Sequence, residues 1–165
     1  MKHLILMRHA KSSWDHPDLS DHDRPLNLRG RTDAPRMAEY IAAELPQIQK
    51  ASISTSERTQ ETWSHIAAPC KVAEANLNLD ARLYLAGIDD MIQVLREFDD
   101  ADEVVFLLGH NPGTTMFANY FKGAGFANVP TAGVIHIELE AEHWSEVVLG
   151  GGTVQRAMFP RDLPT

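Results

Sequence analysis

Short apolar runs separated by polar segments predict a series of strands along the chain. Residues 2–7 and 104–108 are mostly apolar, which is typical of strands that are buried on both faces of a sheet. A shorter run of the same kind occupies 51–55, and 71–75 is a further candidate strand. Towards the end of the chain, two more runs are predicted to form a closing pair of strands at a sheet edge, over 133–139 and 145–149.

Apolar residues at helical spacing predict four helices between these strands. Ser54 and Glu57 have the spacing of a capping box, which predicts a helix start between the second strand and the second helix. Asn111 and Pro112 are predicted to be the N-cap and the first-turn proline of the last helix. The polar stretch before the first helix is predicted to be a loop, over 11–29. The four helices are predicted over 30–45, 58–68, 88–98 and 111–122.

Strands that alternate with helices predict the fold class. Such a chain forms a mostly parallel sheet with helices on both faces, because each crossover between parallel strands returns across the sheet. We find no internal repeat, low-complexity tract or linker that would divide the chain. The sequence therefore predicts an α/β fold, a single domain over 1–165 with three layers in the order α/β/α.

The composition agrees with one globular domain and excludes several classes of function. Hydrophobic residues make up 44% and charged residues 23% of the 165 positions, which is ordinary for a soluble protein. Fifteen Lys and Arg against 23 Asp and Glu give a net charge of −8, which argues against a nucleic-acid binder. Cys70 is the only cysteine, so no intramolecular disulfide can form. No stretch suits a membrane span or a signal peptide, so a cytoplasmic location is expected.

Arginine and histidine residues follow three of the predicted strands. Arg8 and His9 follow the first, Arg58 follows the second, and His110 follows 104–108. Ligands of open α/β sheets bind outside the carboxyl ends of the strands, so we expect these side chains to converge. Guanidinium groups match phosphate oxygens, and a neutral imidazole among cations can attack phosphorus. The set therefore predicts phosphoryl transfer.

Each of these signals has a purely structural explanation when it is taken alone. An Arg-His pair is a weak signal that also suits a polar strand end, Arg58 suits a solvated helix, and the segment around His110 suits a tight turn. Their occurrence at three successive strand ends favours a shared site. The alternative from another class of function is a binding module that holds a phosphorylated partner without turnover. His9 favours an enzyme, because simple anion binding does not require it.

The ordered motifs of the chain resemble a known family. They are similar to the histidine phosphatase superfamily, whose fold is also called phosphoglycerate mutase-like, and within it to the short SixA-like phosphohistidine phosphatases. The resemblance extends over essentially the whole chain. The segments that carry it are Arg8-His9, Arg58-Thr59 and Gly109-His110, together with LMRHAKSSW, DRPLNLRG, LY before the third helix, GHNPG and a PRDLP-like tail.

This resemblance implies a role for each matching residue. His9 would be the nucleophile, and Arg8, Arg58 and His110 would form the phosphate pocket. Arg24, in the DRPLNLRG segment, matches an additional arginine that the subgroup brings to the site. The implied activity is that of a phosphatase with a covalent phosphohistidine intermediate. The implied substrate is phosphohistidine on a protein, and the alternative within the superfamily is a small phosphomonoester.

The chain departs from the family pattern at several positions near the site. Ala10 replaces the usual glycine, as is common in the subgroup. Ser12 stands where many relatives have a phosphate-contacting threonine, and it is kept with Asn111 as a candidate for phosphate binding. Asp15 replaces an asparagine and is not a candidate, because a carboxylate is a poor phosphate ligand. Trp14 is predicted to be a core or rim residue that can touch a substrate.

Neither a general acid nor a metal site is evident in the sequence. Larger relatives place a general acid between the second and third helices, where this chain has only Asp80, Asp89 and Asp90, all of which suit a loop or a helix start. The loop over 11–29 is rich in Asp and His, but its spacing fits no EF-hand or zinc motif. We therefore expect no metal and no cofactor. The sequence leaves the oligomeric state open.

Overall fold

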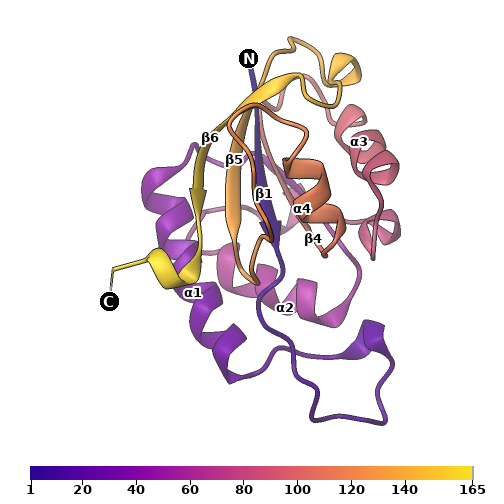
Figure 1. Cartoon of the computed structure of the whole chain (residues 1–165), viewed down its shortest axis with the longest axis vertical. Helices are drawn as coiled ribbons and strands as arrows, with labels where there is room; N and C mark the ends of the chain where they lie inside the picture. Colours follow the sequence, from indigo (N-terminus) through magenta and orange to yellow (C-terminus); the bar gives the residue numbers. More distant parts are fainter. Residues whose placement is uncertain (165) are drawn as a thin grey trace.

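The computed structural model, which describes residues 1–164, contains one six-stranded sheet between two layers of helices (Figure 1). The strand order is β3-β2-β4-β1-β5-β6, with β3, β2, β4 and β1 parallel and both pairings of β5 antiparallel. The prediction of a three-layer α/β fold with a mostly parallel sheet is confirmed. The strands are β1 (Lys2–Arg8), β2 (Lys50–Ile53), β3 (Leu77–Leu79), β4 (Val104–Gly109), β5 (Val134–Leu139) and β6 (Gly152–Met158).

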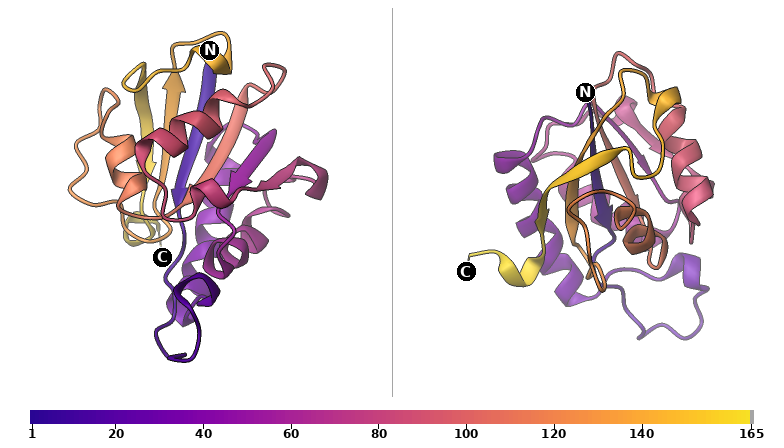
Figure 2. Two further views of the ribbon diagram at one scale, coloured as in Figure 1. Left: turned by 90° about the vertical axis from the view of Figure 1, so that its right-hand side faces the viewer. Right: turned by 45° about the horizontal axis from the view of Figure 1, so that its top comes forward.

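Helices cover both faces of the sheet (Figure 2). In the central strand β1, Ile5 and Met7 pack on the side of α1 and α2, whereas Leu4 and Leu6 pack on the side of α3 and α4. Successive side chains of a strand point to opposite faces, so a strand covered on both sides needs a continuous apolar run. The helices are α1 (Leu28–Glu44), α2 (Glu57–Ile66), α3 (Ile88–Arg96) and α4 (Gly113–Ala118), with short 3₁₀ helices η1 (Asp21–Asp23), η2 (Glu74–Asn76), η3 (Ala81–Leu83), η4 (Trp144–Glu146) and η5 (Pro160–Asp162).

The register of the sheet aligns the carboxyl ends of three strands. Arg8, the last residue of β1, pairs with Gly109, the last residue of β4. Ile53, the last residue of β2, pairs with Leu108. The backbone N–H of His9 then donates to the carbonyl oxygen of Gly109 at 3.0 Å, which continues the pairing beyond β1. The segments that follow β1, β2 and β4 therefore start side by side.

The first helix, α1, begins two residues earlier than predicted. Asn27 is its N-cap, and the Asn27 side chain accepts a hydrogen bond from the backbone N–H of Gly30. A Cβ atom at Gly30 would lie 2.2 Å from the carbonyl oxygen of Lys11. Only glycine permits this approach. The close contact packs the loop that follows His9 against the start of α1.

The second helix, α2, is capped by a different serine from the one predicted. The side chain of Ser56, not that of Ser54, accepts the hydrogen bond from the N–H of Thr59. The capping-box prediction was wrong because the Ser54 hydroxyl has another partner, the Nε2 atom of His110 at 2.8 Å. The serine that looked like a local cap is thus a long-range contact of a site histidine.

The fourth helix, α4, is shorter than predicted. It ends at Ala118 rather than near 122. The side-chain oxygen of Asn119 accepts hydrogen bonds from the N–H groups of Gly125 and Phe126, which turns the chain back after the helix. A polar side chain that bonds to nearby backbone competes with helix continuation.

The start of α4 also differs from the predicted cap. Pro112 occupies the N-cap position, and no side chain caps the helix there. Asn111 lies one residue earlier, and its side-chain oxygen accepts a hydrogen bond from the N–H of Thr115 at 3.2 Å. A Cβ atom at Gly113 would lie 2.3 Å from the carbonyl oxygen of Ala86, so this glycine permits close packing of α4 on the segment before α3.

The candidate strand at 71–75 was a wrong prediction. Lys71 has a left-handed backbone conformation with φ of 56°, and η2 begins at Glu74. Strand β3 follows only at Leu77, and it has three residues on the outer edge of the sheet. Short edge strands bury little side-chain surface, so they leave a weak hydrophobic pattern.

The strand predicted at 145–149 was also wrong. Trp144 and Val147 in this region are buried in the core, but the segment holds η4 and a turn, with Gly150 at a φ of 79°. The last strand is β6, which was missed. It pairs with β5 at the sheet edge, where Thr153 also forms a bridge with Lys122, and most of its side chains are exposed or half-buried. An edge strand of this kind shows no apolar run.

Candidate active site

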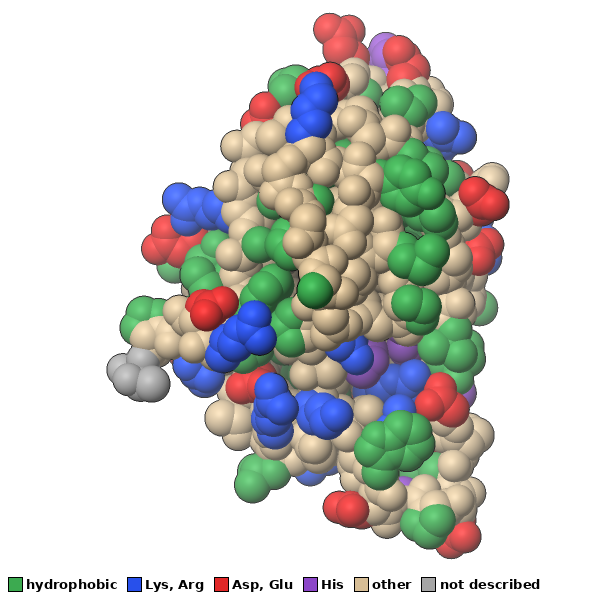
Figure 3. All heavy atoms as spheres, in the orientation of Figure 1, with side chains coloured by type: hydrophobic (Ala, Val, Ile, Leu, Met, Phe, Trp, Pro, Cys, Tyr) green, Lys and Arg blue, Asp and Glu red, His purple; other side chains and the backbone are tan. Residues whose placement is uncertain are grey.

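The four principal site candidates lie together where β1, β2 and β4 end. Arg8, His9, Arg58 and His110 line a cavity of about 230 Å³. Figure 3 shows histidine and basic side chains gathered beside the loop at the bottom of the view. The structure therefore brings these four residues together as expected. The cavity is also lined by Lys11, Ser12, Trp14, Arg24, Leu85, Asn111 and Thr131.

His9 is buried, and its ring is held in one tautomer. Nδ1 lies 2.6 Å from the carbonyl oxygen of Ala10. A carbonyl only accepts, so Nδ1 carries the hydrogen and Nε2 of the neutral ring has an unprotonated lone pair, towards which Nε of Arg58 donates at 3.4 Å. Burial lowers the pKa of His9 from its usual 6.5 to about 3, and the charges of Arg58, Arg8 and Arg24 act in the same direction.

His110 is buried next to Arg58 and a group of hydroxyls. Its Nδ1 lies 3.2 Å from Nη2 of Arg58, and a guanidinium only donates, so Nδ1 is the acceptor. Its Nε2 lies 2.8 Å from the Ser54 hydroxyl, with the hydroxyls of Ser56 and Thr59 at 3.4 and 3.5 Å. Burial is the main cause that lowers the pKa of His110 to about 3. Both site histidines are therefore neutral at neutral pH.

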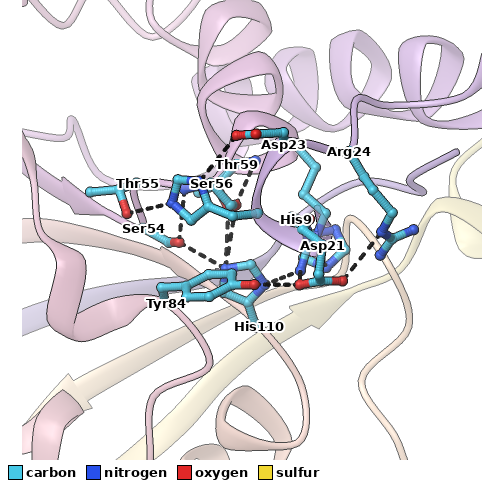
Figure 4. Close-up of polar contacts among 12 residues, drawn as sticks. His9, Asp21, Asp23, Arg24, Ser54, Thr55, Ser56, Thr59, Tyr84 and His110 are labelled. Carbon is cyan, nitrogen blue, oxygen red and sulfur yellow. Dashed lines mark hydrogen bonds and ion pairs between the residues drawn. The ribbon is translucent and has the colours of Figure 1, made fainter. Parts of the chain in front are cut away.

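Two buried arginines share the carboxylate of Asp21. Arg58 donates from Nη1 to the backbone oxygen of Asp21 at 2.6 Å and from Nη2 to Oδ2 at 3.0 Å. Arg24 donates from Nε to Oδ1 at 3.2 Å and from Nη1 to the backbone oxygen of Ser13 at 3.0 Å. Figure 4 shows Asp21 between Arg24 and Tyr84, above His110. The two arginines are thus held from the side of the loop over 11–29.

Arg8, Ser12 and Asn111, the remaining predicted residues, differ in whether their side chains have partners within the protein. Arg8 lines the cavity, and its buried Nε has no hydrogen-bond partner within the described residues, so an oxyanion there would satisfy it. Ser12 is buried in the lining and pairs through its backbone with Leu26. The amide nitrogen of Asn111 donates to Asn128 and to the backbone of Val129. The Asn111 amide therefore has structural partners, and we leave it out of the phosphate pocket proposed below.

Sequence reasoning missed two residues of the site, Asp21 and Tyr84. The Tyr84 hydroxyl donates to Oδ2 of Asp21 at 2.5 Å, and the Tyr84 ring lies edge-on to His110, with centroids 5.3 Å apart. Two weak signals were present in the sequence. Asp21 stands three residues before Arg24, and Tyr84 belongs to the LY motif. Neither signal separates these residues from solvated neighbours.

The three carboxylates considered as general acids lie at helix starts, outside the cavity that contains His9. Asp80 caps η3, and its carboxylate receives three hydrogen bonds from Arg82. Asp89 and Asp90 lie in the first turn of α3, where a carboxylate complements the helix dipole. None of these three residues lines the cavity with His9.

A second cavity is a weaker candidate for a functional site than the cavity that His9 lines. This larger cavity of about 390 Å³ lies beside β3, but its Arg82 is bound by Asp80 and Glu97, and neither site histidine lines it. Among residues 1–164, no three His, Cys, Asp or Glu side chains cluster as metal ligands. No helix in the same range is long and apolar enough to cross a membrane. We therefore take the smaller cavity, in which the cationic groups converge, as the candidate site.

The low pKa values of the site histidines give a testable expectation. Both rings should stay neutral from pH 8 to pH 5, because burial and nearby guanidinium groups disfavour the imidazolium form. Ring ¹⁵N NMR in phosphate-free buffer would show unchanged His9 and His110 signals over this range. His143 is the control, since a hydrogen bond to Asp100 raises its pKa and its signal should titrate. A His9 midpoint near 6.5 would contradict the burial that we describe.

Comparison with known proteins places the chain in a family. Residues 4–84 match the model of the histidine phosphatase superfamily, branch 1. The uncharacterised protein Rv1276c of Mycobacterium tuberculosis is 30% identical to the chain over 168 residues, which cover 94% of this chain and 100% of that protein. The match with this relative therefore extends along nearly the whole chain.

Solved structures share the same fold. The protein histidine phosphatase SixA complexed with tungstate matches with a TM-score of 0.81 at 20% identity, over 98% of this chain and 99% of that one. The mycobacterial glucosyl-3-phosphoglycerate phosphatase Rv2419c, in complex with VO3, matches with a TM-score of 0.67 at 13% identity, over 94% and 98%. The sequence match and the shared fold agree with the arginine and histidine cavity, and the chain belongs to the histidine phosphatase superfamily and is a phosphatase.

Proposed function

We propose that the chain hydrolyses phosphohistidine on a protein substrate, through a covalent phosphohistidine intermediate on His9. The observation that carries the proposal is the state of the His9 ring. Ala10 holds the hydrogen on Nδ1, and the low pKa keeps Nε2 free of a proton. A neutral imidazole nitrogen in a cavity lined by guanidinium groups can attack a phosphoryl group. Simple anion binding would not require this arrangement.

The reaction proceeds in two half-reactions. In the first, Nε2 of His9 forms a bond to phosphorus while the bond from phosphorus to the leaving atom breaks. In the second, a water oxygen forms a bond to phosphorus, the bond to His9 breaks, and inorganic phosphate leaves with the neutral imidazole restored. Arg8, Arg24 and Arg58 hold the non-bridging oxygens and stabilise the charge on them in the transition state.

His110 can donate to the phosphoryl group only after its hydrogen moves. In the free protein, Nδ1 accepts from Arg58 and Nε2 carries the hydrogen. When a phosphoryl oxygen takes the place of Nδ1 as the acceptor for Arg58, the ring can change to the other neutral tautomer. The hydroxyls of Ser54, Ser56 and Thr59 around Nε2 can then donate to it, since a hydroxyl both donates and accepts. Nδ1–H would face the transferred group.

The acidic side chains near the cavity are poor proton donors, which favours a substrate whose leaving group needs no general acid. An alkoxide needs a general acid, which typically contributes about 10²–10⁴-fold. Hydrogen bonds from Tyr84 and Arg58 lower the pKa of Asp21 to about 2, so it holds no proton to give. Burial and the hydrogen bond to Asp21 raise the pKa of Tyr84, which makes its hydroxyl a weak acid. An imidazole leaves more readily, because solvent can protonate its other ring nitrogen.

The mouth of the cavity supports a protein substrate. Trp14 and Leu85 line the cavity and yet expose 73% and 57% of their surface. The guanidinium of Arg24 covers one face of the Trp14 ring, at 3.6 Å from its centroid. Exposed apolar side chains at the rim of a polar pocket suit contact with a second protein surface. A phosphorylated side chain on such a surface can reach His9 from this rim.

The alternative function is hydrolysis of a small phosphomonoester. The fold is shared with the mycobacterial glucosyl-3-phosphoglycerate phosphatase, so the architecture by itself does not select a protein substrate. A phosphate-binding module without turnover is the third possibility. The ionised Asp21 and the weakly acidic Tyr84 favour the phosphohistidine proposal over the first alternative. The unprotonated Nε2 of His9 favours it over the second.

A side-by-side rate comparison tests the proposal. Phosphohistidine on a carrier protein, a nitrophenyl phosphate, phosphoserine and a sugar phosphate would be compared in the presence of a chelator. We expect fast turnover of phosphohistidine, appreciable turnover of the aryl ester, and alkyl phosphates slower by about 10²–10⁴-fold. The chelator should have no effect, because guanidinium groups supply the charge that a metal would supply.

The matched controls are Asp80→Asn, Asp89→Asn and Asp90→Asn. Each removes a carboxylate from the region where larger relatives place an acid. We expect phosphohistidine turnover to change by less than about tenfold, below the usual contribution of an acid. Sugar phosphates that react as fast as phosphohistidine, with one of these variants selectively losing that activity, would overturn the substrate assignment. Activity lost to the chelator and restored by one divalent ion would overturn metal independence.

A further inference from the structure

One carboxylate connects three side chains of the site that come from distant parts of the sequence. Asp21 lies in η1 and accepts from Arg24 through Oδ1 and from Arg58 through Oδ2, while Tyr84 also donates to Oδ2. Arg58 makes a second hydrogen bond, to the backbone oxygen of the same residue. Asp21 is therefore the common partner of two arginines that we place on the phosphate.

The Asp21 carboxylate reduces the repulsion between the positive charges around the cavity. Arg24 and Arg58 are both buried, and their like charges repel each other without an anion between them. The guanidinium groups of Arg8, Arg24 and Arg58 and the ammonium group of Lys11 outnumber this one carboxylate, with both histidines neutral. An excess of positive charge suits a phosphoryl dianion. The carboxylate is also ionised at any working pH.

We propose that Asp21 is a positioning residue, which fixes the guanidinium planes of Arg24 and Arg58 for the transferred phosphoryl group. The Asp21 backbone oxygen and Oδ2 hold Nη1 and Nη2 of Arg58, and this directs Nε and Nη2 of Arg58 towards His9 and His110, at 3.4 and 3.2 Å. The inference rests on the proposed function, since it takes the cavity as the phosphoryl site. It assigns Asp21 no contact with the substrate.

Tyr84 completes this arrangement from the side of Asp21 that faces away from Arg24 (Figure 4). Its hydroxyl fixes Oδ2 of Asp21, and the guanidinium of Arg58 lies 6.0 Å from the centre of the Tyr84 ring. Tyr84 comes directly after η3, whereas Asp21 lies in the loop between β1 and α1. The hydrogen bond thus ties the loop that carries Arg24 to the segment before α3. We expect Tyr84→Phe to disturb the same step as a change at Asp21.

The test uses the isosteric variant Asp21→Asn. An amide has one acceptor oxygen, so its NH₂ group must face either Arg24 or the pair formed by Arg58 and Tyr84. One guanidinium then loses its hydrogen bond to this side chain, while the backbone contacts of both arginines and the volume of the side chain are kept. We expect kcat on a nitrophenyl phosphate to fall by about 10–100-fold, because misplaced charge donors stabilise the transition state less. The affinity for inorganic phosphate, measured by calorimetry, should stay within about threefold, because the removed negative charge offsets the looser fit.

Asp23→Asn is the matched control, since it removes the same charge two residues away. The Asp23 carboxylate is exposed, and within residues 1–164 its side-chain partner is His22. It should leave kcat within about twofold of wild type. Tyr84→Phe should lower kcat in the same direction, and its effect should not add to that of Asp21→Asn, since both act through one contact.

Three results would overturn the proposal. One is an unchanged kcat in Asp21→Asn. Another is phosphate affinity that tightens while kcat rises, as expected if Asp21 only competes with the substrate as an anion. The third is an equal loss of kcat and phosphate affinity, as expected if Asp21 only maintains the fold. Phosphate binding is measured without turnover, so a failure of the proposed function would appear separately, as wild-type protein that binds phosphate but hydrolyses nothing.

Discussion

Replacing His9 by alanine is expected to abolish turnover and covalent labelling together. Nε2 of His9 is the atom that we propose to carry the phosphoryl group, and in the structure it is unprotonated within a cavity lined by guanidinium groups. Without this nitrogen the two-step route has no first acceptor. Wild-type protein quenched during reaction with ³²P-labelled substrate should retain phosphate that is labile in acid and stable in base, as a phosphoramidate is. His9→Ala should retain none.

His136→Ala is a suitable control for this experiment. Like His9 and His110, His136 is a buried histidine with a lowered pKa, but it lies on β5, where its Nε2 is 3.1 Å from Nδ1 of His3. Its removal should leave labelling intact, and thermal melting would check that both variants are folded. Near wild-type turnover in His9→Ala would refute the nucleophile assignment. Turnover by the wild type without any labelling would favour direct attack by water.

Replacing Arg58 by alanine is expected to lower kcat/KM by about two to four powers of ten. This is the scale for removing a charge-stabilising donor from a desolvated site. Arg58 contacts both site histidines, His9 and His110, and also Asp21. Its removal therefore also takes one of three hydrogen-bonding side chains from the Asp21 carboxylate, which keeps Arg24 and Tyr84. Steady-state kinetics on phosphohistidine and on a nitrophenyl ester would measure the loss.

Arg58→Lys should recover only part of the activity. A lysine supplies a point charge, whereas the planar guanidinium donates from Nε, Nη1 and Nη2 to separate partners in the free protein. Arg31→Ala is the matched control, because Arg31 is a largely exposed arginine paired with Glu61 outside the cavity. Full rescue by lysine would mean that Arg58 contributes charge alone. Unchanged kinetics in Arg58→Ala would remove Arg58 from the catalytic set.

Buried strands could be predicted from the sequence, whereas strands at the sheet edges could not. Strands β1 and β4 are covered on both faces, so their residues must be apolar and the pattern is visible without the fold. Strands β3 and β6 lie at the sheet edges, where exposure permits polar residues, and both were misplaced. The predicted positions of β1 and β4 in a parallel sheet were sufficient to place Arg8, His9 and His110 at one edge.

Local signals were least reliable where a side chain had a distant partner. Ser54 and Ser56 are both acceptable helix caps by sequence, and the choice between them depends on the hydrogen bond that Ser54 accepts from His110, 56 residues away. The helix that starts at Glu57 is therefore predictable, but its cap is not. A capping pattern contains no information about a contact that forms only when two strands pair.

The sequence by itself determined the class of the protein and the identity of its main chemical groups. Runs of apolar residues specified the α/β architecture, and the ordered motifs around His9, Arg58 and His110 specified phosphoryl chemistry. These features are local, because each lies within a few residues of a strand end. The positions of strand ends in a parallel sheet are enough to predict that they meet.

Only the tertiary structure decided how these groups are held and protonated. Asp21 and Tyr84 are 63 residues apart, and their contact depends on the loop after β1 reaching the segment before α3. The tautomers of His9 and His110 depend on single acceptors and donors, the carbonyl of Ala10 and the guanidinium of Arg58. Hydrogen bonds of this kind are set by distances of a few tenths of an ångström, which packing fixes and sequence spacing does not encode.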